Sequence, residues 1–183
     1  IKVDFEPIDF VQVNSDINQR MVHFAIEQLQ LGPDDRVLDL YCGIGNFSLP
    51  LARKAGTVLG IEGEKTLVAR GPQNAQKNGL DNVEFRVANL SEIDGTEAWV
   101  KAGWDRVLLD PARSGAAEMV ERMKLLSPER IVYVSCHPGT LARDAGVLVH
   151  EQGYKCPQAA LSTHHTILTS IGVRPQHADG SET

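Results

Sequence analysis

The fold of this chain is decided by Val37-Leu38-Asp39-Leu40-Tyr41-Cys42-Gly43-Ile44-Gly45-Asn46. A short apolar run ends there in two closely spaced glycines, and a segment with helical spacing follows. Gly43 and Gly45 let the backbone turn tightly and come close to a ligand, which the N-terminus of the next helix would face. A strand, a glycine turn and a helix in this order indicate an α/β domain with a binding site at the turn.

Similar short runs rich in β-branched residues recur along the chain. The predicted strands are Arg36–Leu40, Thr57–Ile61, Val83–Val87, Arg106–Leu109 and Arg130–Val134. Helical spacing lies between them, most clearly in Gln19–Leu31, Leu67–Asn78, Ala116–Leu125 and Leu141–Glu151. This alternation predicts a doubly wound α/β domain with a mostly parallel sheet.

The composition is that of one globular domain. The 183 residues are 42% hydrophobic and 23% charged, which excludes a collagenous, disordered or disulfide-stapled chain. Lys and Arg total 18 against 24 Asp and Glu, a net charge of −6. The acidic balance argues against a general basic coat for nucleic acid, although it leaves room for a local basic groove.

The three cysteines, Cys42, Cys136 and Cys156, are widely spaced and form no CxxC pair. We therefore expect no disulfide framework, no metal site and a reducing, cytoplasmic setting. The chain has no apolar run near the ~18 residues of a membrane helix and no signal peptide, so no membrane partner is expected. It starts at Ile1 without an initiator Met, which suggests a piece of a longer protein.

A cofactor site is expected at the carboxyl ends of the strands. Glu62 ends the second strand, and an acidic residue there commonly accepts hydrogen bonds from ribose hydroxyls. Position 48 is Ser where a dinucleotide fingerprint has its third glycine, which favours S-adenosylmethionine over NAD. Asn89 and Asp110 follow the third and fourth strands and would face the same pocket. A purely structural turn, and a loop or cap role for Asn89, remain as alternatives.

Cys136 follows the fifth strand at the same edge, among polar neighbours and before a helix N-terminus that would lower a thiol pKa. The alternative is a small buried hydrophobe, which is the usual role of a free cysteine. A thiolate beside a methyl donor suits one chemical problem. Carbon 5 of uracil becomes nucleophilic only after a thiolate adds to carbon 6, and a base must later remove the carbon-5 proton.

The chain resembles the RNA (uracil-5-)-methyltransferases, especially the bacterial 23S rRNA enzymes, over roughly residues 3 to 155. The matching stretches are Asp9–Asn14, Val37–Phe47, Ala69–Gly79, Leu109-Asp110-Pro111-Ala112-Arg113, Tyr133-Val134-Ser135-Cys136 and Thr140-Leu141-Ala142-Arg143-Asp144. The resemblance implies a Rossmann-like class I S-adenosylmethionine-dependent domain over residues 1–173, including a leading segment and helix at 1–31. Residues 174–183 would form a polar flexible tail.

The resemblance also implies roles for individual residues. Cys136, as the nucleophile, and Asp110 would be the catalytic residues, and S-adenosylmethionine would be contacted by Gln12, Tyr41, Asn46, Glu62, Asn89 and Asp110, in addition to Gly43 of the loop. The implied reaction methylates carbon 5 of a uridine in RNA, 23S rRNA or tRNA, and yields S-adenosylhomocysteine. Full-length relatives resemble a three-part protein with an upstream RNA-binding barrel, a central insert and, in some members, an iron–sulfur cluster. We expect neither the upstream parts nor the cluster in this chain, and Arg113, Arg143 and Lys124 as its local phosphate contacts.

Two departures from the family pattern bear on the mechanism. His137 stands where the family has Asn or Asp after Ser-Cys, so the imidazole either assists thiolate formation or is a tolerated loop residue. The family's C-terminal Glu base is missing, with Thr169 at the nearest position and His164 or His165 as substitutes. The main rival function is therefore a degenerate S-adenosylmethionine-binding module with impaired turnover. An NAD(P)-dependent oxidoreductase is a third alternative.

Overall fold

A computed structural model describes residues 15–156, 160–162 and 167–172. The helices are α1 (Ser15–Leu29), α2 (Ser48–Ala52), α3 (Lys65–Val68), α4 (Gly71–Lys77), α5 (Ala117–Glu121), α6 (Met123–Leu126) and α7 (Pro138–Gly146), with a 3₁₀ turn η1 (Val100–Ala102) and a π-helical turn η2 (Val147–Glu151). The strands are β1 (Arg36–Leu40), β2 (Thr57–Glu62), β3 (Val83–Val87), β4 (Arg106–Leu109), β5 (Arg130–Ser135), β6 (Ala160–Ser162) and β7 (Ile167–Gly172).

The strands form a single sheet in the order β3-β2-β1-β4-β5-β7-β6. Strands β1 to β5 are parallel, whereas β7 runs antiparallel to both β5 and β6. The predicted doubly wound, mostly parallel sheet is therefore confirmed. The chain order reverses beside β1, between β2 and β4, which is where open α/β sheets bind their ligands.

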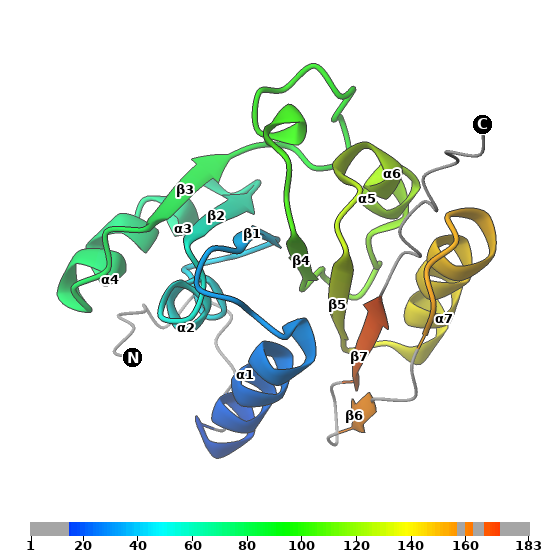
Figure 1. Ribbon diagram of the computed structural model, residues 1–183, viewed down its shortest axis with the longest axis horizontal. Coiled ribbons are helices and arrows are strands. Elements are labelled where there is room, and N and C mark those ends of the chain that lie inside the picture. The colour runs from blue at the N-terminus through cyan, green and yellow to red at the C-terminus, as the bar shows by residue number, and fades with distance from the viewer. Residues whose placement is uncertain (1–14, 157–159, 163–166, 173–183) are drawn as a thin grey trace, which may run out of the picture.

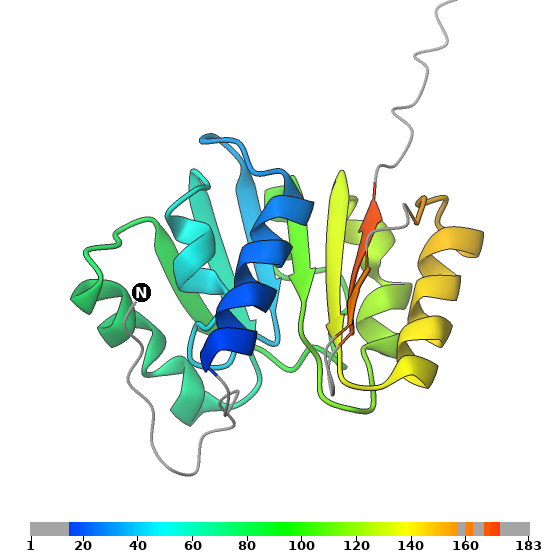
Figure 2. The same cartoon turned by 90° about the horizontal axis from the view of Figure 1, so that it is seen from below.

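Helices cover both faces of the sheet (Figure 1). Helices α1 and α2 lie against one face, and α5, α6 and α7 lie against the other. Figure 2 shows α1 running across one face of the sheet. The core has two parts accordingly: Val37, Val58, Leu108 and Val132 pack under α1 and α2, whereas Leu38, Leu59, Val107 and Ile131 pack with residues of α5 and α6. The alternation along each strand shows that the sheet is buried on both faces.

Three of the predicted helices are interrupted. The segment predicted as one helix over Leu67–Asn78 is two helices, α3 and α4, because Pro72 has no N–H to donate and its ring clashes with the preceding turn. Pro72 instead lies in the first turn of α4, where the missing N–H costs nothing. Likewise, the segment 116–125 divides into α5 and α6, and α7 passes directly into η2.

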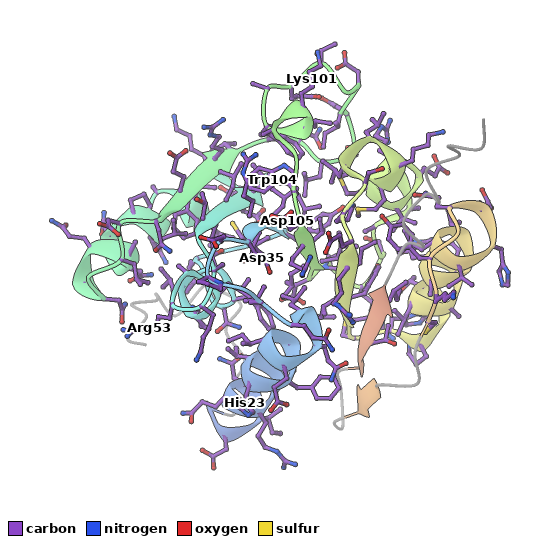
Figure 3. The ribbon with its side chains drawn as sticks, viewed as in Figure 1. His23, Asp35, Arg53, Lys101, Trp104 and Asp105 are labelled. Atoms are coloured by element: carbon purple, nitrogen blue, oxygen red, sulfur yellow. The ribbon has the colours of Figure 1, made fainter. Side chains whose placement is uncertain are left out.

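The amino ends of the strands are joined by charged contacts. Arg106 of β4 lies 3.5 Å from Asp35 and 2.6 Å from Glu129. Asp105 accepts the backbone N–H of Arg36 at 2.7 Å. Figure 3 labels Asp35, Trp104 and Asp105 in this region. These contacts tie β1, β4 and β5 together at the edge opposite to the glycine loop.

None of the helices in the described part of the chain is long and apolar enough to cross a membrane. Within the same residues, no group of three or more His, Cys, Asp or Glu side chains is arranged to hold a metal ion. Residues 1–14 and 174–183, which hold Gln12 and the predicted tail, lie outside the described residues, as do His164 and His165.

Candidate cofactor and nucleophile site

The glycine loop after β1 has the tight geometry that its sequence predicts. Tyr41, Gly43 and Gly45 have positive φ angles of 64°, 54° and 95°. The loop is fixed to the neighbouring strand because the N–H of Cys42 donates to the carbonyl oxygen of Ile61 at 3.1 Å. The non-glycine residue in this conformation, Tyr41, is strained and lies at the end of β1, as functional residues often do.

The space beneath the loop is filled by small and buried side chains. A Cβ on Gly60 of β2 would lie 2.8 Å from the Cys42 sulfur, so glycine is required for this close packing. Cys42 is buried under the loop, and burial raises the pKa of its thiol. Ser48 donates its hydroxyl to Oδ2 of the fully buried Asp39, whose Oδ1 has no hydrogen-bond partner in the described structure.

Glu62 and the glycine loop are in direct contact. Glu62 Oε2 accepts the N–H of Gly43 at 3.2 Å, and its Oε1 accepts the N–H of Glu64 at 3.0 Å. The carboxylate at the end of β2 therefore lies where the sequence placed it, beside the loop that would receive a nucleoside. Half-buried Tyr41 lies in the same region, and burial is the main cause that raises its pKa to about 12.

Asn46 and Asn89 have partners that the sequence did not predict. The Asn46 and Asn18 amides donate to each other at 2.8 and 2.9 Å, so the Asn46 side chain joins the loop to α1. Asn89 is exposed, and its side-chain oxygen accepts from the N–H and hydroxyl of Ser91 in the loop after β3, which is the loop role left open above. Gln12 lies outside the described residues, six positions before Asn18.

Asp110 ends β4 next to the loop. Its backbone N–H donates to the carbonyl oxygen of Leu40 at 3.2 Å, and no hydrogen bond reaches its carboxylate from the described residues. Desolvation raises the pKa of Asp110 to about 7. Burial also raises the pKa of Asp39 to about 7, and the nearby charges of Asp110 and Glu62 add to this rise. Three carboxylates thus lie at the loop, and of these Asp110 accepts no hydrogen bond from the described residues, an arrangement that favours a bound cation.

Cys136 lies at the same edge of the sheet. Leu109 pairs with Tyr133, so Asp110 lies one residue and Cys136 three residues beyond this pair on adjacent parallel strands. The thiol is free and exposed, whereas the alternative of a buried hydrophobe would require burial. Helix α7 begins at Pro138, which confirms the predicted helix N-terminus beside the cysteine. Cys156 is exposed as well, at the far end of α7 and η2.

His137 has a structural partner. It is the N-cap of α7, and its Nδ1 accepts the N–H of Thr140 at 3.2 Å. The same N–H would otherwise be one of the unpaired donors at the start of the helix. With Nδ1 used in this way, the imidazole is more than a tolerated loop residue and is not free to take the thiol proton at that nitrogen.

Thr169 lies in β7 opposite Tyr133, two pairs away from the edge pair of Ser135 and Ile167. The residue is only 9% exposed, and its hydroxyl lies 4.0 Å from the sulfur of Cys156. Its position is therefore set back from the edge where Cys136 lies, which argues against Thr169 as the replacement for the missing base.

Arg143, predicted as a phosphate contact, is instead held by the protein. Its Nε donates to Asp144 at 2.7 Å, and its Nη2 donates to the carbonyl oxygen of Ser114 at 3.1 Å. A separate hollow of about 290 Å³ lies at the amino ends of β1, β2 and β3, beside Trp99 and Trp104. It does not include any of the predicted site residues.

Residues 4–166 match the family model of tRNA (uracil-5-)-methyltransferase. The chain belongs to this family. Membership favours methyl transfer over the NAD(P)-dependent oxidoreductase alternative, and it agrees with the mostly parallel α/β sheet described above.

The relatives of this chain are longer proteins. It is 54% identical over 94% of its length to the 23S rRNA (uracil(1939)-C(5))-methyltransferase RlmD of Xanthomonas axonopodis pv. citri and covers 40% of that protein. It is 52% identical, over the same shares, to the RlmD of Stenotrophomonas maltophilia. The chain therefore spans about two fifths of the length of these relatives.

Solved structures agree with this family and fold. The tRNA (uracil-54, C5)-methyltransferase of Pyrococcus abyssi, in complex with S-adenosyl-L-homocysteine, is 30% identical with a TM-score of 0.73, over 92% of this chain and 42% of that one. The magnesium protoporphyrin IX methyltransferase of Synechocystis, with bound SAM, is 19% identical with a TM-score of 0.64, over 90% of this chain and 86% of that one. The second likeness shows the fold alone.

Proposed function

We propose that this chain is the catalytic domain of an RNA (uracil-5-)-methyltransferase that modifies a uridine of 23S rRNA through a covalent bond to Cys136. The observation that carries the proposal is the exposed Cys136 thiol directly after β5, beside the strand that Asp110 follows, at the edge that also holds the glycine loop. Identity of 54% to a 23S rRNA enzyme, against 30% to a tRNA enzyme, favours ribosomal RNA.

The residues fit S-adenosylmethionine as the cofactor. The Glu62 carboxylate beside Gly43 suits the ribose hydroxyls, and the desolvated Asp110 carboxylate, which lacks a hydrogen bond within the described part, suits the positive sulfonium. S-adenosylmethionine would supply the methyl group and leave as S-adenosylhomocysteine.

Cys136 would act on the uracil ring. Its thiolate forms a bond to carbon 6, and the electron pair of the C5–C6 double bond makes carbon 5 nucleophilic toward the methyl group. A base then takes the carbon-5 proton, and the electron pair left behind restores the double bond and expels the thiolate. Helix α7 begins two residues after Cys136, so the N-terminus of this helix lies next to the thiol that would attack the ring.

The missing carboxylate base supports slow turnover as a second candidate. Thr169 is almost buried and lies back from the edge, and a threonine hydroxyl is a poor base at neutral pH. If no other group removes the carbon-5 proton, the bond between Cys136 and the methylated uracil persists. The chain would then bind S-adenosylmethionine and RNA and stop at the adduct.

The test is incubation of the chain with S-adenosylmethionine and 5-fluorouracil-substituted 23S rRNA fragments, followed by denaturing electrophoresis. We expect a denaturant-stable adduct with the wild type and its loss in Cys136→Ser. Cys156→Ser is the matched control because it removes the other exposed thiol and should leave the adduct unchanged. An adduct that survives Cys136→Ser, or its absence in the wild type despite bound cofactor, contradicts the proposal.

Unsubstituted RNA separates full catalysis from an arrested reaction. Release of free methylated RNA over many turnovers indicates that a base is present. Adduct that accumulates without release indicates the arrested module.

A further inference from the structure

A buried carboxylate of α7 connects the two segments that follow Asp110 and Cys136. Asp144 is 1% exposed, and its Oδ2 accepts both the hydroxyl of Tyr133 at 2.6 Å and the N–H of Ala116 at 2.8 Å. Its Oδ1 accepts Nε and Nη2 of Arg143, each at 2.7 Å. These four hydrogen-bond donors compensate the carboxylate for the water that it loses on burial.

The donors come from three parts of the chain. Tyr133 lies in β5, three residues before the cysteine. Ala116 ends the loop that begins after Asp110, and Arg143 lies in α7 itself. Asp144 therefore fixes the loop that follows Asp110, strand β5 and helix α7 relative to one another. We call this set, Asp144 with Tyr133, Ala116 and Arg143, the Asp144 cluster.

Further contacts hold the same loop against α7. Arg143 Nη2 donates to the carbonyl oxygen of Ser114 at 3.1 Å. The hydroxyl of Thr140 donates to the carbonyl oxygen of Arg113 at 3.4 Å. Gly115 has a φ of 82°, and a Cβ there would lie 2.6 Å from Arg143 Nη2 and 2.7 Å from Asp144 Oδ2. The loop thus approaches the ion pair so closely that only glycine fits.

The Asp144 carboxylate also affects the titration of its two side-chain partners. Burial and the hydrogen bond to Asp144 raise the pKa of the Tyr133 hydroxyl. The same carboxylate raises the pKa of Arg143. Neither Asp144 nor Tyr133 reaches the surface, so neither is available to contact RNA.

We infer that Asp144 is a positioning residue for the methyl transfer: it fixes the loop after Asp110 against α7, and so sets the carboxylate of Asp110 relative to the thiol of Cys136. The inference rests on the proposed function and adds to it a residue that touches neither reacting group. A change of this separation would slow the reaction between groups that are each intact.

The test uses changes at the edges of the cluster, because removal of Asp144 itself leaves several buried donors unpaired and endangers the fold. Tyr133→Phe removes one donor, and its control is Tyr154→Phe, which removes a buried tyrosine hydroxyl bonded to the carbonyl oxygen of Pro128 at 2.9 Å, at the opposite end of β5. Gly115→Ala forces the ion pair apart. Its control is Gly153→Ala, at a φ of 76° with no atom within 4 Å of the new Cβ.

The measurements are the rate of adduct formation with 5-fluorouracil RNA at saturating RNA and S-adenosylmethionine, and the dissociation constant of S-adenosylmethionine by calorimetry. We expect Tyr133→Phe and Gly115→Ala to lower the rate at least tenfold while the dissociation constant changes less than twofold. The two controls should keep the wild-type rate within twofold, even where their melting temperatures fall as far as those of Tyr133→Phe and Gly115→Ala.

Equal losses of rate in the variants and their controls overturn the inference, as does a rate that falls only in parallel with cofactor affinity. A wild type that binds S-adenosylmethionine but forms no adduct contradicts the proposed function instead. Hydrogen exchange of the peptide over residues 111–116 then tests the coupling without RNA. Exchange that rises in Tyr133→Phe and not in Tyr154→Phe supports it, and unchanged exchange refutes it.

Discussion

Single carboxylates at the glycine loop carry the charge that a sulfonium cofactor would neutralise. Asp39 and Asp110 both have pKa values raised to about 7, and burial is the main cause in each case. A raised carboxyl pKa means that the proton is held at pH 6 and released at pH 8. A cation that binds beside these groups therefore favours their ionised form.

The cofactor and its product should consequently respond differently to pH. We expect the affinity for S-adenosylmethionine to rise about tenfold between pH 6 and pH 8, because a group with a pKa near 7 becomes mostly ionised over this range. S-adenosylhomocysteine lacks the sulfonium charge and should change far less. Calorimetry at the two pH values measures both, and Asp110→Asn should flatten the curve. Identical pH profiles for the two ligands would show that these carboxylates do not face the sulfonium.

His137 caps helix α7 at a position where the family pattern has Asn or Asp. The family resemblance has Asn or Asp at this position, which are among the best N-cap residues. In this chain the imidazole Nδ1 caps α7 through the N–H of Thr140. The departure from the family therefore preserves a helix cap, which explains it without a role in proton transfer.

Replacement of His137 separates capping from chemistry. His137→Asn should keep the stability and the rate of adduct formation of the wild type, because the amide oxygen caps the same N–H. His137→Ala should lose about 1 kcal/mol of unfolding free energy, the usual cost of an N-cap. Urea unfolding and the adduct assay measure the two effects. A large loss of rate in His137→Asn, at unchanged stability, would instead assign the imidazole a part in the reaction.

Among the elements, the glycine loop, β2 and α4 meet around one aromatic ring. A Cβ on Gly71, Gly60 or Gly45 would lie 2.5, 2.9 or 3.0 Å from an atom of the Phe85 ring. The ring of β3 therefore sets how closely α4 and the loop approach the sheet. Helix α4 begins at Gly71, directly before Pro72, so the residue packed against the ring is also the first residue of the helix.

Gly71→Ala should be destabilising in spite of its helical position. The new methyl group overlaps the root of the Phe85 ring, and such overpacking costs about 1 to 3 kcal/mol. The control is Gly146→Ala in α7, where no atom lies closer than 4.0 Å to the new Cβ and helix propensity should add up to about 1 kcal/mol. Thermal unfolding compares the two. Equal stability of both variants would mean that Phe85 moves aside without cost.

For the whole molecule, charge and length limit what the chain does alone. It carries 24 acidic and 18 basic residues, and it spans about two fifths of the relatives that act on 23S rRNA. Affinity for RNA comes largely from basic groups that neutralise phosphates. Arg143 is already held by Asp144 and Ser114, which reduces the local basic surface further.

Binding of RNA by this chain should accordingly be weak. We expect its affinity for a 23S rRNA fragment to be at least tenfold lower than that of the full-length Xanthomonas axonopodis relative at the same salt concentration, since fewer phosphates are neutralised. Filter binding over a range of salt concentrations gives both affinity and salt dependence. Equal affinities, with equal salt dependence, would show that this domain carries the main RNA contacts.

The sequence by itself determined the parallel sheet, the loop and the family. Strands Arg36–Leu40, Val83–Val87 and Arg106–Leu109 begin and end where the pattern predicts, because runs of β-branched and apolar residues between turn signals are local properties. The positions of Glu62, Asp110 and Cys136 followed, since the ends of parallel strands share one edge. The roles assigned to Gln12, Asn89 and Cys136 stay proposals.

Only the tertiary structure decided which side chains meet within this frame. The Asn46 side chain hydrogen-bonds that of Asn18, 28 positions away, and the Asp144 carboxylate accepts the N–H of Ala116, also 28 positions away. Thr169 matches the missing base in sequence, yet the register of β7 on β5 places it away from the edge. Such contacts depend on register and on the packing of distant segments, and no local pattern of residues encodes these.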